Sequence, residues 1–225
     1  MITDLQTYVY RTFFIATIYS LVLFYFASNK SAKFMVGIIL WGILHSLLAY
    51  VGFYENTKTM PPRFLFVIFP IILVILASIF SKNMKDWLAA FNLKQLMFLH
   101  AVRIPVELVL FWLFLADYVP ELMTFEGRNF DILAGITAPI MVLIAFRSNK
   151  INKTLLWGWH ILSIILLANI LVNAILSMPT VLQQFAFDQP NVAVTKFPFL
   201  LLPVIIVPLV LISNIAGFIK LRRLQ

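Results

Sequence analysis

The amino-acid sequence predicts an all-α integral membrane protein with seven transmembrane helices. Of its 225 residues, 62% are hydrophobic and 12% are charged, and this charged fraction is about half that of a globular domain. The mean hydropathy is +0.98, so a soluble domain of this size could not bury its apolar surface. Apolar runs long enough to cross a bilayer recur along the chain, without the alternation that is typical of barrel strands.

Each predicted helix is an apolar window long enough for one bilayer crossing. The seven windows cover residues 9–27, 34–54, 64–80, 95–116, 130–146, 154–177 and 197–219. Their boundaries are defined to within about two to four residues. The whole chain, residues 1–225, is therefore expected to form a single transmembrane domain.

The distribution of basic residues predicts the orientation, because cytoplasmic loops carry an excess of Lys and Arg. One set of loops holds eleven of them and the opposite set holds five. The eleven are Lys30, Lys33, Lys82, Lys85, Lys94, Arg147, Lys150, Lys153, Lys220, Arg222 and Arg223, and the five are Arg11, Lys58, Arg63, Arg128 and Lys196. We expect a multi-pass protein of the cell membrane with its N-terminus outside and its C-terminus in the cytoplasm. This asymmetry accounts for the net charge of +8 without a nucleic acid partner.

An internal repeat is also predicted. The Ser-Asn-Lys motif at 28–30 recurs at 148–150, the Trp-Gly pair at 41–42 recurs at 157–158, and Pro70 matches Pro203. The repeat halves are residues 8–80 and 128–219, and a linker helix at 95–116 separates them. Because each half has an odd number of helices, the linker restores the same orientation, which gives a 3+1+3 parallel tandem repeat.

This architecture resembles the SWEET-type and PnuC-type transporters, which are 3+1+3 parallel repeats, and the seven-helix rhodopsin-like bundle. The resemblance covers the whole chain but only its architecture, and the chain has no Pro-Gln loop motif, so no functional residue is carried over. The seventh window has no lysine between Lys196 and Lys220, which excludes a retinal Schiff base on that helix.

Five ionisable residues are expected well inside the bilayer, where such groups are costly and mark functional sites. They are His45, His100, Arg103, Glu107 and His160. At 100° per residue, the three on the fourth helix share one face within about 60°. Arg103 and Glu107 are four residues apart and predict an ion pair. The pair could be structural, or it could belong to a binding or proton-relay site.

These residues predict a protein that binds or transports a small polar or anionic solute at a mid-membrane site on the fourth helix. Arg103, Glu107 and His45 are expected to line a polar cavity, and Glu107 or a histidine could couple protons. One alternative is a haem- or metal-binding membrane redox enzyme that uses His45, His100 and His160. The other is a structural subunit of a membrane complex. The sequence predicts no cofactor, contains no cysteine for thiolate metal sites, and leaves enzymatic activity and oligomerisation open.

A polar loop at 117–131 supplies further candidates for binding a solute or cation. They are Glu121, Glu126, Arg128, Asn129 and Asp131. An alternative assigns Asn129 to capping the fifth helix and Asp131 to the first turn of that helix.

Overall fold

A computed structural model describes residues 2, 4–57, 59–147 and 151–224. These residues form helices and no strand. The α-helices are α1 (Thr7–Ala27), α2 (Ala32–Tyr50), α3 (Leu65–Phe80), α4 (Lys82–Ala89), α5 (Leu93–Leu99), α6 (Arg103–Leu115), α7 (Asp131–Ala145), α8 (Lys153–Leu176) and α9 (Val207–Arg223). Short 3-10 segments are η1 (Phe53–Glu55), η2 (His100–Val102), η3 (Glu121–Met123) and η4 (Ala193–Thr195), and η5 (Leu202–Ile206) is π-helical.

The helices fit a membrane helical bundle. Within the described residues, five apolar helices are long enough to cross a membrane: α1, α2, the continuous Leu93–Leu115, α8 and the continuous Leu202–Arg223. A sixth is present if α3 is counted together with α4, from which it is bent by 91°. All seven predicted windows overlap a helix, but α7 has only 15 residues. Seven crossings, and the orientation of the chain in the membrane, therefore stay predictions.

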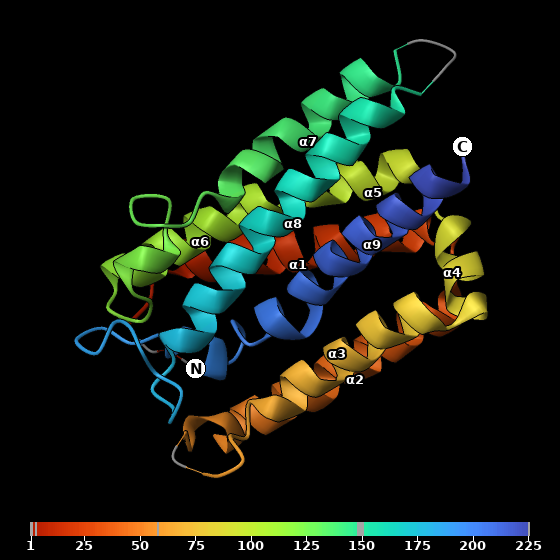
Figure 1. The fold of residues 1–225 in the computed structure, drawn as a ribbon. Helices are drawn as coiled ribbons and strands as arrows, with labels where there is room; N and C mark the ends of the chain where they lie inside the picture. The colour runs from red at the N-terminus through yellow and green to blue at the C-terminus, as the bar shows by residue number, and fades with distance from the viewer. Residues whose placement is uncertain (1, 3, 58, 148–150, 225) are drawn as a thin grey trace.

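The turn between α1 and α2, helix α4 and the C-terminal end of α9 lie toward the same end of the bundle (Figure 1). At this end Arg223 of α9 forms an ion pair with Asp86 of α4. At the opposite end Lys196 pairs with Glu55, with 3.3 Å between Nζ and Oε2. These two ion pairs therefore lie at opposite ends of the bundle.

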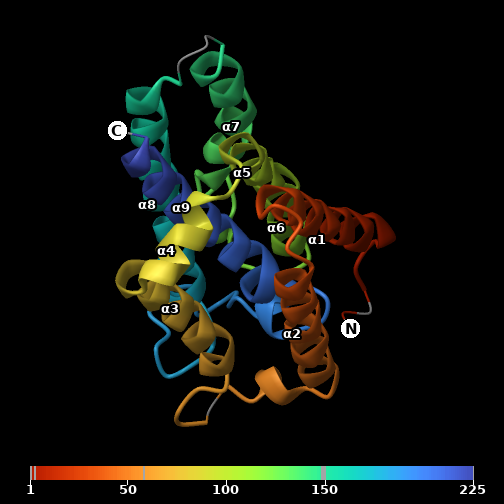
Figure 2. The same ribbon diagram turned by 90° about the vertical axis from the view of Figure 1, so that its right-hand side faces the viewer.

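Helix α9 lies at the centre of the bundle and packs against α4, α5 and α8. Helix α1 packs against α5 and α6, and α7 packs against α8. Helices α2 and α3 lie on the outside, where both contact η5; they overlap in Figure 1 and are separate in Figure 2. Both expose large apolar side chains such as Leu47 and Phe69, as lipid-facing helices do.

Two irregular helical segments, η2 and η5, contain or adjoin a proline, whereas Pro70 and Pro139 lie inside the regular helices α3 and α7. Pro105 has no N–H to bond the carbonyl of Ala101, and the helix tightens into 3-10 geometry at η2. Pro203 lies inside the π-helical η5, and Pro208 follows at the start of α9. The helix geometry therefore changes locally at η2, within the span Leu93–Leu115, and at η5, at the start of the span Leu202–Arg223.

The internal repeat stays a prediction. Residues 148–150, the second Ser-Asn-Lys motif, lie outside the described residues, as does Lys58. Pro70 lies within the α-helix α3, whereas its predicted counterpart Pro203 lies in π-helical η5.

Candidate functional site

The connection between α6 and α7 folds back into the bundle. Helix α6 continues to Leu115, yet the first residue of α7, Asp131, contacts Arg103 at the first residue of α6. A helix rises 1.5 Å per residue, so this contact lies about 18 Å before the end of α6. Figure 1 shows α7 beginning beside the middle of the bundle. This return explains why α7 is shorter than a full span.

A buried ion pair joins three helices at this level. Arg103 Nη1 lies 2.5 Å from Asp131 Oδ1, and the two side chains are only 3% and 8% exposed. The guanidinium also donates to Ser163 on α8, from Nη1 to the carbonyl at 3.2 Å and from Nη2 to Oγ at 2.9 Å. Arg103 is in the middle of the apolar helix Leu93–Leu115. The charge therefore lies halfway along this helix and is neutralised by a carboxylate on a neighbouring helix.

The predicted ion pair between Arg103 and Glu107 is wrong. Within the described ranges Arg103 pairs with Asp131, and Glu107 Oε1 accepts a hydrogen bond from Asn129 Nδ2 at 2.5 Å. The prediction considered partners on one helix only. The returning loop brings Asn129 and Asp131 to the same face of α6. There the Asn129 amide bonds Glu107, and the Asp131 carboxylate pairs with Arg103.

Three hydrogen bonds fix the orientation of the Asn129 amide. Its Nδ2 donates to Glu107 Oε1 and, at 3.0 Å, to the carbonyl of Met123. Its Oδ1 accepts from the backbone N–H of Asp131 at 3.0 Å. This last bond satisfies a free donor in the first turn of α7 from one residue before its N-cap, which is Phe130. A reversed amide would lose all three bonds, so Asn129 presents an N–H to Glu107.

His100 and His160 lie together, with 6.2 Å between their ring centroids. Both are fully buried. His100 Nε2 is 3.1 Å from Ser213 Oγ, and His160 Nδ1 is 3.0 Å from Asn214 Oδ1. Because Ser213 and Asn214 are on α9, the two histidines connect η2 and α8 to the central helix. His100 precedes Arg103 by one helical turn, so the cluster adjoins the ion pair.

His45 does not join this cluster. Its Nδ1 lies 2.5 Å from the hydroxyl of Tyr54, and its ring centroid lies 4.0 Å from that of Trp41. Burial raises the pKa of Tyr54 to about 12, so the phenol stays protonated at neutral pH and donates this hydrogen bond. The contact fastens η1 to α2. The predicted set of three histidines is therefore not brought together.

The remaining candidates in the loop at 117–131 are exposed. They are Glu121, Glu126 and Arg128. The backbone carbonyl of Arg128 accepts from Asn169 Nδ2 at 2.7 Å, which ties the loop to α8. Only Asn129 and Asp131, of the five loop candidates, belong to the buried polar cluster.

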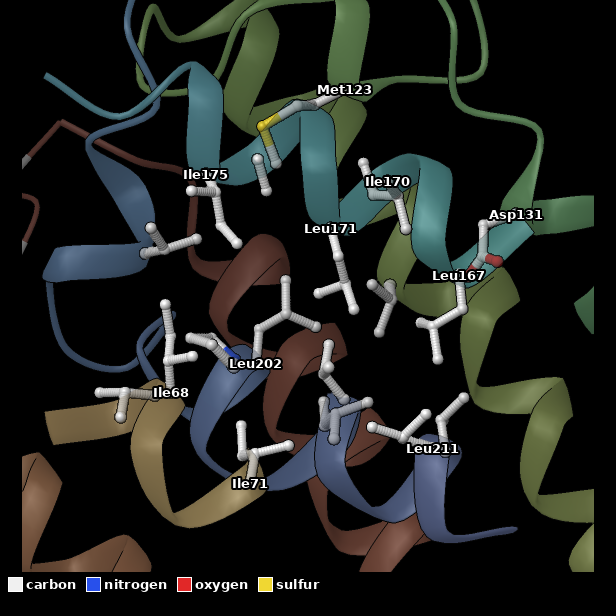
Figure 3. A pocket seen from close by; sticks show the side chains of 18 of the residues that line it. Ile68, Ile71, Met123, Asp131, Leu167, Ile170, Leu171, Ile175, Leu202 and Leu211 are labelled. Carbon is white, nitrogen blue, oxygen red and sulfur yellow. The ribbon is translucent and has the colours of Figure 1, made fainter. Parts of the chain in front are cut away.

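A cavity of about 260 Å³ adjoins the polar cluster. Aliphatic side chains of α3, α6, α8, η5 and α9 form most of its wall. Figure 3 shows Ile68 and Ile71 of α3 facing Leu171 and Ile175 of α8 across this space, with Asp131 at one end. The polar members of the wall are Arg103, Glu107, Asp131 and Asn191. The cavity is therefore a largely apolar space with polar groups in a few places.

Two polar residues of this site are not among the candidates from the sequence. Ser163 holds the guanidinium of Arg103, and Asn191, in the segment between α8 and η4, lines the cavity. Ser163 lies three residues after His160, one turn along the same face of α8, and that spacing is a signal in the sequence. Asn191 sits in a connecting segment and has no comparable signal.

The described ranges contain no group of three His, Asp or Glu side chains arranged to hold a metal ion. Of the three histidines predicted as haem or metal ligands, His100 and His160 lie next to each other in the fold.

No curated protein and no solved structure matches this chain. One family model matches residues 59–222, which is more than half of the chain. The matched range includes every residue that lines the cavity and all of the buried polar cluster. The chain therefore belongs to this family, which is described as a domain of unknown function (DUF8737).

Proposed function

We propose that this membrane protein binds a small, mainly apolar molecule with one polar end, which it takes from the surrounding bilayer into the cavity. The cavity carries this proposal, since its wall is aliphatic over most of its area and includes the polar residues Arg103, Glu107 and Asp131. Its volume of about 260 Å³ is just below the range of roughly 300–1,000 Å³ that is typical of ligand sites. A single alkyl chain or a small ring system suits this volume.

The aliphatic wall favours such a molecule over the polar solute that the sequence suggests. A buried polar molecule needs a hydrogen-bond partner for each of its polar groups. The cavity offers partners in only a few places, whereas isoleucine, leucine and valine side chains form the rest of its wall. Transport of the bound molecule across the membrane is an extension of the proposal, with binding as its first step.

The packing of α3 supports access from the bilayer. In the part of the chain that the structure describes, α3 packs against α4, α9 and η5 and makes no substantial contact with α8. Both helices nevertheless line the cavity. Ile72 of α3 is a lining residue and is 45% exposed, so the cavity is not sealed on this side. An apolar opening of this kind faces acyl chains in a bilayer.

A photoreactive decanol with a diazirine on its chain tests the proposal on the protein in lipid nanodiscs. We expect the cavity-lining residues of α8 to take up more label than Val172, which is on the same helix and 53% exposed. Ala174→Phe places a phenyl ring in the cavity, and we expect it to lower the labelling of the cavity about tenfold. Mass spectrometry of the labelled peptides measures both quantities.

Val172→Phe is the matched control, because it adds the same side chain to the exposed face of α8. It should leave the labelling of the cavity unchanged. Equal labelling of cavity and exposed positions, unaffected by Ala174→Phe, would contradict the proposed binding site.

A further inference from the structure

A second apolar space lies between α2 and α3. It is an open groove with a volume of about 290 Å³, and residues of η5 and α9 complete its wall. Ile38 and Trp41 of α2 line one side of it, and Pro70 and Val74 of α3 line the other. In the described residues both helices contact η5 but make no substantial contact with each other, and Figure 2 shows them apart. The bundle therefore leaves a space between these two helices that the described side chains do not fill.

A lysine lies at one end of this groove. Lys33 follows Ala32, the first residue of α2, and it is exposed and lines the groove. None of the ion pairs in the described ranges includes it. Every other residue of the groove wall is uncharged. The groove thus has one cationic end and an apolar body.

Helix α4 lies beside this cationic end. Its Trp87 contacts Phe34, the residue after Lys33, with 4.7 Å between the ring centroids. The 91° bend after α3 turns α4 across the end of that helix. Tryptophan and lysine at the end of an apolar helix are typical of the level of the lipid head groups, and α4 carries Trp87 together with Lys82 and Lys85. We therefore expect this end of the groove to lie at the membrane surface.

The charges near this end favour an anionic partner. Residues 28–33 and α4 together hold four lysines, and Asp86 is their single acidic residue. Arg223 already neutralises Asp86. Basic side chains beside transmembrane helices attract anionic head groups, and an apolar groove between such helices accepts an acyl chain. A phospholipid with a negatively charged head group has both parts, whereas a zwitterionic phospholipid matches the groove but not the excess of positive charge.

We propose that the groove between α2 and α3 binds an anionic phospholipid, with one acyl chain between the two helices and the phosphate beside Lys33. The bound lipid fills the space that separates the helices and so supports both of them against η5. This site is independent of the small molecule proposed for the cavity, since Lys33, Gly37 and Trp41 line the groove and not the cavity.

Gly37 offers a position from which the groove can be filled. Lys33, Gly37 and Trp41 are spaced four residues apart, so they share one stripe of α2, and all three line the groove. A Cβ at Gly37 would meet no atom within 4 Å. Gly37→Leu therefore places a side chain in the space proposed for the acyl chain. Gly158→Leu is the matched control, because a Cβ there also meets no atom within 4 Å and the residue lines neither space.

Native mass spectrometry of the protein in detergent tests the proposal by titration with phosphatidylglycerol and, separately, with phosphatidylcholine of the same acyl chains. In the wild type we expect the first phosphatidylglycerol to bind about tenfold more tightly than the first phosphatidylcholine. Gly37→Leu should weaken the binding of both lipids about tenfold, and Gly158→Leu should leave it unchanged. Lys33→Gln should lower the affinity for phosphatidylglycerol about fivefold and leave that for phosphatidylcholine unchanged. Lys94→Gln, which removes an exposed lysine outside the groove, should change neither affinity.

Melting temperatures without added lipid show whether each variant is folded. If Gly37→Leu does not fold, the comparison of Lys33→Gln with Lys94→Gln decides by itself. Equal affinities for the two lipids, or equal losses from the two lysine variants, would overturn the proposal. A dimer without bound lipid would also overturn it, because it would assign the groove to a second copy of the chain. Labelling of the cavity by the photoreactive decanol should be the same in Gly37→Leu as in the wild type, so the failure of one proposal leaves the other standing.

Discussion

Asp131→Asn is expected to lower the free energy of unfolding by about 3–5 kcal/mol, since it leaves a buried charge without its counter-ion. Arg103 is 3% exposed and lies within an apolar helix, so water cannot replace the lost carboxylate. Asparagine can still accept a hydrogen bond but does not balance the charge. Unfolding in detergent micelles with increasing denaturant measures the difference from the wild type.

Two further variants separate the ion pair from a general effect of substitution. Arg103→Met combined with Asp131→Leu removes both charges, and we expect it to recover most of the lost stability, because apolar replacements of buried pairs are often neutral. Glu107→Gln should cost no more than about 1 kcal/mol, since its bond to Asn129 can be kept. A loss for Glu107→Gln equal to that for Asp131→Asn would mean that Glu107 is the counter-ion.

Gly217→Ala is expected to destabilise the protein by about 1–3 kcal/mol through overpacking. A Cβ at this position would overlap the imidazole ring of His160, and it would lie closer than any ordinary contact. The ring cannot move aside freely, because it is fully buried and Asn214 holds its Nδ1 at 3.0 Å. The contact between α8 and α9 must therefore loosen. Thermal unfolding measures this loss.

Gly158→Ala is the matched control on α8, since a Cβ there meets no atom within 4 Å. Alanine should stabilise that helix by roughly 0.5–1 kcal/mol relative to glycine. A double-mutant cycle of Gly217→Ala with His160→Ala should show strong coupling, because the ring is the obstacle. Equal effects of the two glycine substitutions, without coupling to His160, would rule out the close packing of α8 on α9.

The positions of most helices can be predicted from the sequence because long apolar windows are a strong local signal. The window at 64–80 matches α3 (Leu65–Phe80), and the window at 154–177 matches α8 (Lys153–Leu176). The short helix α4 is missed, although the hydroxyl of Ser81 caps it by accepting from the N–H of Met84 at 3.3 Å. Eight residues are too few to give a clear periodic pattern.

The site is predictable only in part. The spacing of Arg103 and Glu107 correctly places both on one buried face of α6, because that spacing is a local property of the helix. The pairing of Arg103 with Asp131 depends on how far the 117–130 connection returns into the bundle, which no local pattern encodes. The apolar character of the cavity likewise arises from α3, α6, α8 and the continuous segment of η5 and α9, which are distant from one another in the sequence.

A structure of the protein determined in a lipid nanodisc tests the central claim most directly. The account predicts Arg103 paired with Asp131, Glu107 bonded to Asn129, and elongated density in the cavity. An α3 packed tightly against α8 with no density between them, or an ion pair of Arg103 with Glu107, would contradict it.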